Sequence, residues 1–136
     1  MQPIRKSVRI AAPIEKVWAA LTDPESIRGW MGLDSVVRVD LQVGGRYQLF
    51  GGETTGVFTQ IQKPGVLEYT WRQGEWPAEW ADSVVRWELA SDGPGTRVTL
   101  AHDGFPNEAE RDGHAEGWDL YWLGPMQDWL EKTDRH

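Results

Sequence analysis

Residues 117–132, GWDLYWLGPMQDWLEK, form the last long run of the chain in which apolar residues recur at helical spacing. At about 100° per residue, the apolar side chains gather on one side of the helix. They are Trp118, Trp122, Met126, Trp129 and Leu130. The pattern predicts an amphipathic helix from about residue 114 to residue 132, about 28 Å long. A helix of this length can lie across a whole sheet, and the space between the two layers is then packed core or a pocket.

The pair Gly124-Pro125 interrupts the helical pattern. Proline removes one backbone hydrogen bond and normally kinks a helix, whereas a neighbouring glycine relieves the steric clash. We therefore expect a departure from regular i to i−4 bonding, and a bend, near Gly124. Two helices separated at this point are the alternative.

The N-terminal region predicts one strand followed by two helices. Apolar and polar residues alternate over Ile4–Ile10, as in a strand with one buried face. A helix is expected over residues 13–21, with Pro13 as its first residue. Asp23 is then expected to cap a second, short helix that ends at Gly29.

Residues 35–103 have an almost wholly β pattern. Runs in which apolar and polar residues alternate are separated by glycine pairs at residues 44–45 and 51–52 and by further turn-forming residues. These successive hairpins predict an antiparallel meander with one apolar face, and the first strand is expected to join its edge. Residues 103–113, rich in charge and in turn formers, are expected to be a crossover loop.

Composition and charge restrict the class of protein. At 136 residues without repeat or linker, the chain is expected to form a single domain over residues 1–136. The absence of cysteine excludes disulfides and fits the cytoplasm. No apolar run is long enough for a signal peptide or a membrane span. A net charge of −7 argues against nucleic acid as a partner. We expect a soluble cytoplasmic protein that needs no cofactor.

Five ordered blocks of the sequence carry a resemblance to a known family. They read IRKSVRIAAPIEKVWAALTDPESIRGWMG (4–32), VDLQVGGRYQ (39–48), GVFTQIQKPGVLEYTW (56–71), GTRVTLAHDGF (95–105) and GWDLYWLGPMQDWLE (117–131). Together they resemble the bacterial single-domain relatives of the activator of heat-shock protein 90 ATPase, an AHSA-type group in the START-like (SRPBCC) superfamily. The resemblance implies an α+β helix-grip (START-like, Bet v-like) fold. In it, a curved antiparallel sheet wraps around a long C-terminal helix in the order β-α-α-β-β-β-β-β-β-α and encloses an apolar cavity.

Nine tryptophans against three phenylalanines indicate either a tryptophan-rich core or the wall of a ligand cavity. Strand parity and helix phase select the side chains that face the space between sheet and helix. The candidate ligand-binding residues are Tyr69, Trp71, Trp87, Leu89, Leu100, His102, Trp118, Trp122 and Met126. Plain packing is the alternative explanation for each of them.

His102 is the one histidine that strand alternation predicts to face inward. A neutral imidazole there could orient a ligand or act as a general base, whereas the alternative is a strand-end histidine bonded to the crossover loop. His102, His114 and His136 are too widely spaced to indicate a metal site. No serine or lysine lies in a catalytic motif, so we assign no catalytic residue and no metal.

The leading hypothesis is the binding of a small hydrophobic or aromatic molecule between the sheet and the C-terminal helix. The resemblance adds two alternatives: a co-chaperone-like domain that contacts an Hsp90-type chaperone, and a small hydrolase or cyclase that uses the same cavity. A chaperone and a second copy of the chain therefore stay open as protein partners. The segment QGEWPAEWAD (73–82) departs from the family pattern. Its Trp76 and Trp80 are expected to form a lid, an interface or a cover over the sheet edge.

Overall fold

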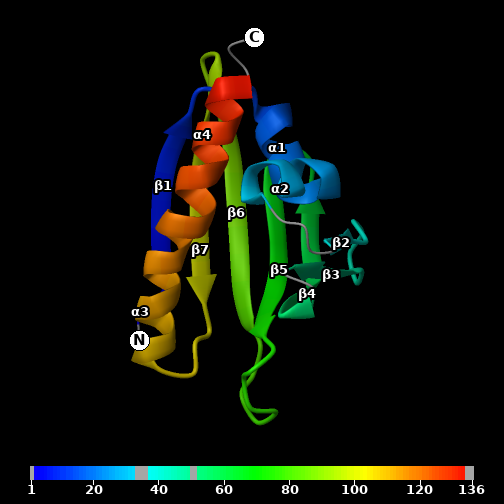
Figure 1. The fold of residues 1–136 in the computed structure, drawn as a ribbon, viewed down its shortest axis with the longest axis vertical. Helices are drawn as coiled ribbons and strands as arrows, with labels where there is room; N and C mark the ends of the chain where they lie inside the picture. Colours follow the sequence, from blue (N-terminus) through cyan, green and yellow to red (C-terminus); the bar gives the residue numbers. More distant parts are fainter. Residues whose placement is uncertain (1, 33–36, 50–51, 134–136) are drawn as a thin grey trace.

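The computed structural model describes residues 2–32, 37–49 and 52–133, and it places a long C-terminal helix across a seven-stranded antiparallel sheet (Figure 1). The strands are β1 (Ile4–Ile10), β2 (Arg38–Val39), β3 (Arg46–Leu49), β4 (Thr54–Gln62), β5 (Val66–Gln73), β6 (Ser83–Asp92) and β7 (Gly95–Asp103). The helices are α1 (Ile14–Thr22), α2 (Pro24–Met31), α3 (Glu108–Gly117), the π-helical turn η2 (Trp118–Leu123) and α4 (Gly124–Thr133). The strand order is β1-β7-β6-β5-β4-β3-β2. The predicted fold class and element order are confirmed, and β1 joins the edge of the sheet beside β7.

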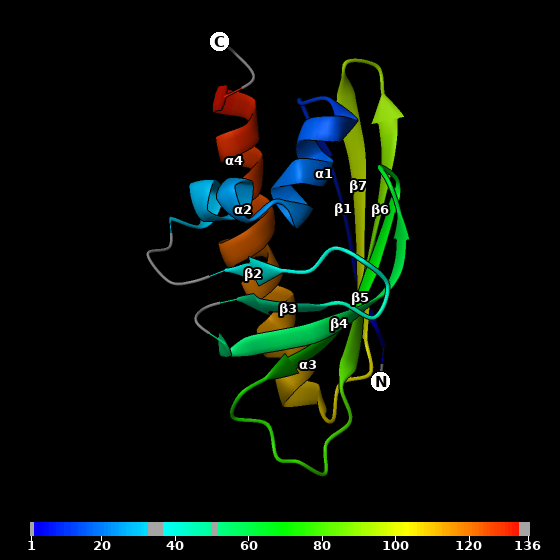
Figure 2. The same ribbon diagram turned by 90° about the vertical axis from the view of Figure 1, so that its right-hand side faces the viewer.

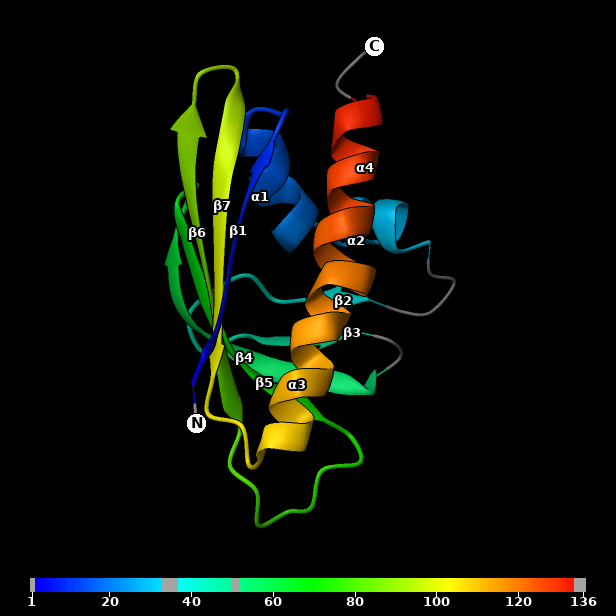
Figure 3. The ribbon, with the colours of Figure 1, turned by 90° about the vertical axis from the view of Figure 1, so that its left-hand side faces the viewer.

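The sheet curves around the C-terminal helix. In Figure 2, β1, β6 and β7 run along the long axis of the molecule, whereas β3 and β4 turn across it. Figure 3 shows the C-terminal helix in front, to one side of β1, β6 and β7, with β2, β3 and β4 passing behind it. The helix therefore lies on the concave side of the sheet, with α1 and α2 covering one end.

One face of the sheet is apolar, as strand alternation predicts. In β6, Ser83, Val85, Trp87 and Leu89 are buried, and the residues between them are exposed or half-buried. β7 is paired on both sides, with β1 from Ile4 to Ile10 and with β6 along its whole length. The buried faces of these central strands and the helix form one core.

The second helix is longer than the sequence predicts, because Gly29 lies inside it. Asp23 caps α2 as expected, and its Oδ2 accepts a backbone hydrogen bond from the first turn at 3.1 Å. The helix passes Gly29 and ends before Gly32, which has a left-handed φ of 65°. The predicted end at Gly29 is therefore wrong. A β-carbon on Gly29 would lie 2.8 Å from Cζ2 of Trp129, so this glycine allows α2 and α4 to approach closely.

Alanine substitutions at two helical glycines are expected to have opposite effects on stability. At Gly113 in α3, a β-carbon would meet no atom within 4 Å. Because alanine is favoured over glycine in a helix interior, Gly113→Ala should raise the free energy of unfolding by about 0.5–1 kcal/mol. Gly29→Ala should lower it, because the Trp129 ring would have to move. Urea denaturation of both variants measures this, and shifts of the same sign would contradict the proposed packing of α2 on α4.

The C-terminal helix begins at Glu108 instead of at about residue 114. Asn107 caps it, and its side-chain oxygen accepts a hydrogen bond from the backbone N–H of Glu110 at 2.9 Å. The expectation of a crossover loop over residues 103–113 is therefore wrong for its second half. No residue of α3 is fully buried, so apolar periodicity gave no signal there.

The helix continues through the Gly124-Pro125 pair by means of a π-helical turn. The backbone N–H of Gly124 donates to the oxygen of Asp119, five residues earlier. Such a turn accommodates one extra residue where regular bonding is disturbed, here directly before Pro125, which has no N–H. Regular i to i−4 bonding is therefore interrupted here as expected, whereas the bend near Gly124 stays a prediction. The alternative of two separate helices is wrong, since the helical run is continuous from Glu108 to Thr133 (Figure 3).

The region before β3 is less regular than expected. β2 covers only Arg38–Val39, and Leu41 and Val43 are exposed, so the apolar alternation does not extend to Leu41. The turn at residues 44–45 is present, with Gly44 at a φ of 86°. Residues 35–36 of the expected strand and residue 51 of the expected turn lie outside the described residues.

Pro13 precedes α1 as its N-cap, with a φ of −61° and a ψ of 150°, and is not the first helical residue that the sequence predicts. In the described part of the chain, none of the helices has the length and apolar character needed to cross a membrane.

Candidate functional site

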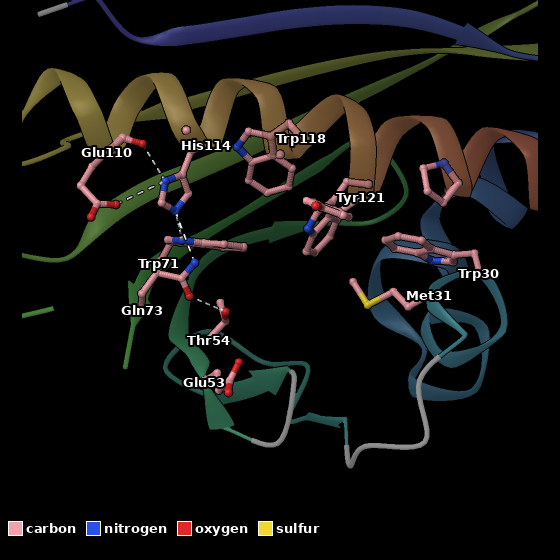
Figure 4. Close-up of a pocket in the computed structure, with 14 residues that line it drawn as sticks. Trp30, Met31, Glu53, Thr54, Trp71, Gln73, Glu110, His114, Trp118 and Tyr121 are labelled. Atoms are coloured by element: carbon pink, nitrogen blue, oxygen red, sulfur yellow. Dashed lines mark hydrogen bonds and ion pairs between the residues drawn. The ribbon is translucent and has the colours of Figure 1, made fainter. Parts of the chain in front are cut away.

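A cavity of about 630 Å³ lies where the C-terminal helix, α2 and the adjoining ends of β4 and β5 meet (Figure 4). Its apolar wall consists mainly of aromatic rings. They belong to Trp30 of α2, Trp71 of β5, and Trp118, Tyr121 and Trp122 of η2. Met31 and Pro125 complete the apolar wall. Gly113 and Gly117 also line the cavity, and because they carry no side chains they leave space on the helix side.

The aromatic rings pack on one another across three elements of the fold. The ring centroids of Trp118 and Trp122 lie 4.8 Å apart, and Trp71 lies 5.1 Å from Trp118. Trp30 joins them through an edge-to-face contact of 5.3 Å with Trp122. Such pairs each add about 0.5–1.5 kcal/mol beyond the area that they bury. The contacts tie α2, β5 and η2 into one aromatic wall.

The opposite end of the cavity is polar. It is lined by Glu53, Thr54, Gln73, Glu110 and His114. The Thr54 hydroxyl donates to Gln73 Oε1 at 2.7 Å, and Gln73 Nε2 lies 3.5 Å from His114 Nε2 (Figure 4). Glu110 Oε2 lies 3.7 Å from His114 Nδ1. Within the described residues, neither the Glu53 nor the Glu110 carboxylate accepts a hydrogen bond.

The hydrogen-bond partners of His114 assign its proton to Nδ1. An indole nitrogen can only donate, and Trp71 Nε1 lies 3.2 Å from His114 Nε2, so Nε2 is the acceptor. A backbone oxygen can only accept, and that of Glu110 lies 2.8 Å from Nδ1, so Nδ1 donates. His114 therefore links β5 to α3 at the polar end of the cavity.

The nine residues predicted to bind a ligand divide into two groups. Trp71, Trp118 and Trp122 line the cavity, and their role in binding stays a prediction. The other six pack in the core and do not line this cavity: Tyr69, Trp87, Leu89, Leu100, His102 and Met126. The expectation that these six form its wall is corrected, because side chains fill the middle of the layer and the open space lies toward one end.

His102 is fully buried, and both of its ring nitrogens are bonded inside the protein. Trp118 Nε1 donates to His102 Nδ1 at 3.0 Å. His102 Nε2 therefore carries the proton and donates to Ser83 Oγ at 2.8 Å, and Ser83 in turn donates to the backbone oxygen of Trp71 at 2.9 Å. The expected hydrogen bond to the crossover loop is wrong, although the ring of Phe105 from that segment packs 4.2 Å from the imidazole. With both nitrogens occupied, His102 can neither anchor a ligand nor act as a general base.

Burial, followed by the nearby His114 ring, lowers the pKa of His102 from 6.5 to about 2. The folded state thus keeps this imidazole neutral, while the unfolded chain takes up a proton as the pH falls below 6.5. The contribution of His102 to stability is complete above pH 6.5 and is lost progressively as the pH falls toward 2.

The stability of the wild type should therefore fall more steeply with acidity than that of His102→Gln, which has no imidazole to titrate. Between pH 6 and 4 the difference in slope should approach about 1.4 kcal/mol per pH unit. Urea denaturation at a series of pH values measures it. Parallel pH profiles for the two proteins would show that His102 titrates normally in the folded state.

None of the five polar residues that line the cavity was predicted to do so. His114 and Glu110 were missed because a loop was expected over residues 103–113. A signal is present: His114, Trp118 and Trp122 follow one another at intervals of four and so share one helix face. The expectation that His102 is the only inward-facing histidine is wrong. The described residues contain no group of three or more histidine, aspartate and glutamate side chains that could hold a metal ion, and His136 lies outside them.

Residues 74–82 form a connection that extends beyond the ends of β5 and β6 (Figure 1), and they do not expose their two tryptophans together. Arg72 holds this segment by donating to three backbone oxygens between Trp76 and Trp80. Trp76 is buried, and its ring lies 6.0 Å from those of Trp80 and His114. The lid, the interface and the cover over the sheet edge that were expected for this pair stay predictions, and the segment joins β5 and β6, which are inner strands of the sheet. Trp76 itself supports His114 at the polar end of the cavity.

Solved structures of other proteins share this fold. A protein described as an HSP90 activator from Plasmodium falciparum has a TM-score of 0.85 and 28% identity, with 96% of each chain covered. CalU16 from Micromonospora echinospora has a TM-score of 0.79 and 28% identity, covering 98% of this chain and 79% of that one. The Aha1 dimer from Colwellia psychrerythraea has a TM-score of 0.80 over 96% and 97% of the two chains, and at 21% identity it shows the fold alone. A sequence comparison with curated proteins gives no significant match.

A family profile covers most of the sequence. It matches residues 11–131, which begin just before α1, end within α4 and include every residue that lines the cavity. The START-like, AHSA-type classification is thereby confirmed. Because the match extends over nearly the whole fold, the chain belongs to the family of activator of Hsp90 ATPase homolog 1-like proteins.

Proposed function

We propose that this protein binds a small hydrophobic or aromatic molecule in the cavity between α2, β5 and the C-terminal helix. The observation that supports this proposal is the aromatic wall around about 630 Å³, a size within the range of roughly 300–1,000 Å³ that is usual for small-molecule sites. The cysteine-free sequence fits a cytoplasmic setting for this function.

The two glycines of the helix side strengthen the proposal. Glycine in a helix interior is less favourable than alanine by about 1 kcal/mol. At Gly113 a β-carbon would meet nothing within 4 Å, and at Gly117 its only neighbour would be Cδ2 of Tyr121 at 3.8 Å. Packing therefore does not require either glycine. A need for open space in the cavity accounts for both.

Native mass spectrometry of freshly purified protein, combined with tryptophan fluorescence during titration with small apolar compounds, tests this function. We expect a co-purified mass or a saturable fluorescence change, since four tryptophans line the cavity. If neither signal occurs with any compound of a broad panel, the cavity is not a ligand site.

An interaction with an Hsp90-type chaperone is a second candidate function. The similarity to an HSP90 activator over 96% of both chains favours it. Leu120 and Tyr121, adjacent on η2 and 56% and 68% exposed, offer an apolar contact surface. We would expect the protein to change the ATPase rate of such a chaperone and Leu120→Ser to weaken that effect. An unchanged rate at saturating protein would remove this candidate.

A hydrolase or cyclase function is not favoured by any observation on the described residues. His102, the residue from which that alternative was argued, is buried with both nitrogens bonded. Catalysis in this cavity would have to use His114 and Glu110.

A further inference from the structure

We propose that the ligand of this cavity carries a positive charge beside its apolar part, as organic amines and quaternary ammonium compounds do, and that the charge lies between the aromatic rings and the Glu110 carboxylate. This inference rests on the proposed ligand-binding function and adds the chemical class of the ligand. Three properties of the cavity wall support it: most of its indole N–H groups are bonded within the protein, two carboxylates line it, and no lysine or arginine is among its described residues.

The hydrogen-bond donors of the wall are mostly used inside the protein. Trp30 Nε1 donates to the backbone oxygen of Ala20 at 2.8 Å. Trp71 Nε1 and Trp118 Nε1 donate to the two histidines, at 3.2 and 3.0 Å. His114 gives its own proton to the backbone of α3. These three indoles can therefore contact a ligand only through carbon atoms and π systems.

The free polar groups of the wall are chiefly anionic acceptors. Glu110 and Glu53 both line the cavity; in Figure 4 the Glu110 carboxylate lies beside His114, 3.7 Å from its Nδ1, and the Glu53 carboxylate lies near Thr54. Among the described residues, neither carboxylate accepts a hydrogen bond or pairs with a lysine or arginine. The donors that remain, the Tyr121 hydroxyl, Trp122 Nε1 and the Gln73 amide, are neutral. An anionic ligand would face two carboxylates with no cation to compensate them.

No lysine or arginine is among the described residues that line the cavity. The arginines on the adjoining elements are engaged elsewhere. Arg72 of β5 donates to the segment 74–82, and Arg111 of α3 donates to the backbone oxygen of Gln2 at 2.8 Å. The net charge of −7 also attracts cations at long range. The electrostatic field of this cavity therefore favours a cation.

The aromatic wall supplies the second half of a cation site. The face of an indole ring carries negative potential and attracts a cation within about 6 Å of its centroid, and sets of such rings bind quaternary ammonium groups. Four tryptophans and one tyrosine line this cavity. An apolar ammonium compound can bury its hydrocarbon part against these rings and direct its charge to Glu110.

Three compounds of similar size separate the effect of charge from that of apolar burial: the cation benzyltrimethylammonium, its uncharged carbon counterpart neopentylbenzene, and the anion phenylacetate. Their binding is followed by calorimetry and tryptophan fluorescence at low and high salt. We expect the cation to bind about tenfold more tightly than neopentylbenzene and to weaken with salt, and phenylacetate to bind least. Equal affinity for benzyltrimethylammonium and neopentylbenzene, or tightest binding of phenylacetate, would refute the proposal that the ligand is positively charged. Either result would still support the cavity as a ligand site. If none of the three binds, the proposed function itself fails.

A matched pair of variants assigns the charge effect to Glu110. Glu110→Gln should weaken benzyltrimethylammonium about three- to tenfold and leave neopentylbenzene unchanged. Glu116→Gln removes the same charge from an exposed position of the same helix that does not line the cavity, and it should change neither affinity. Equal weakening of the cation in both variants would attribute the effect to net charge and overturn the role of Glu110. Near-ultraviolet circular dichroism verifies that both variants fold.

Discussion

Replacing Trp87 with alanine is expected to lower the free energy of unfolding by about 3–5 kcal/mol. Trp87 is fully buried on β6, and its ring packs 5.6 Å from that of Trp118 and 6.1 Å from that of Trp122. Its Nε1 donates to the Tyr69 hydroxyl at 2.9 Å. The substitution therefore removes a large apolar side chain from the core and leaves a buried hydroxyl without its donor. Trp87, a candidate ligand-binding residue by strand alternation, therefore contributes to the core and does not line the cavity.

Urea denaturation followed by far-ultraviolet circular dichroism measures this loss. Tyr121→Ala is the matched control, because it removes an aromatic ring that is 68% exposed, and its effect should stay within about 0.5 kcal/mol. Similar small losses in the two variants would show that Trp87 does not pack as the structure describes.

Replacing Gly117 with phenylalanine is expected to weaken ligand binding at least about a hundredfold without loss of stability. Gly117 lines the cavity and has helical angles, with a φ of −61° and a ψ of −36°. A β-carbon there needs no change of backbone, and its only neighbour within 4 Å would be Tyr121 Cδ2 at 3.8 Å. The phenyl ring would occupy the volume that a ligand needs. Stability should stay the same or rise by up to about 1 kcal/mol, because a helical glycine is removed.

The control for this variant is Glu116→Phe, which adds the same ring at the neighbouring, exposed position. Fluorescence titration should give wild-type affinity for Glu116→Phe and no saturable change for Gly117→Phe. Wild-type affinity in a folded Gly117→Phe protein would show that ligands bind elsewhere.

Much of the fold follows from short-range patterns in the sequence. Alternation in β5, β6 and β7 correctly predicts which side chains face the helix, because a strand reverses its side chains at every residue. Helical spacing likewise predicts that Trp118, Trp122 and Met126 face inward. These rules indicate the buried face of an element. They do not indicate where along that face the packing leaves a space.

The position of the cavity depends on contacts between distant residues. Glycine is unfavourable in a helix interior, yet α2 continues through Gly29 and brings Trp30 to the wall. The lack of a side chain at Gly29 leaves room for Trp129 of α4, a distant residue that spacing does not reveal. Two residues of the polar end of the cavity, Glu110 and His114, belong to α3. No residue of α3 is fully buried, so its sequence has no apolar periodicity that would predict a helix. His114 and Glu110 were therefore missed, while His102 was overvalued because its partners Ser83 and Trp118 could not be known from spacing.

The central claim is that a ligand binds against the tryptophan wall of this cavity. The most direct measurement is a titration of ¹⁵N-labelled protein, in which each indole N–H gives its own nuclear magnetic resonance signal, with whichever of the three compounds above binds. If the ligand binds in the cavity, we expect saturable shifts of the indole signals of the four tryptophans that line it, all with one common dissociation constant. These are Trp30, Trp71, Trp118 and Trp122. Trp18 and Trp129, which do not line it, should keep their positions. Largest shifts at Trp18 and Trp129, or no saturable shift with any of the compounds, would contradict the claim.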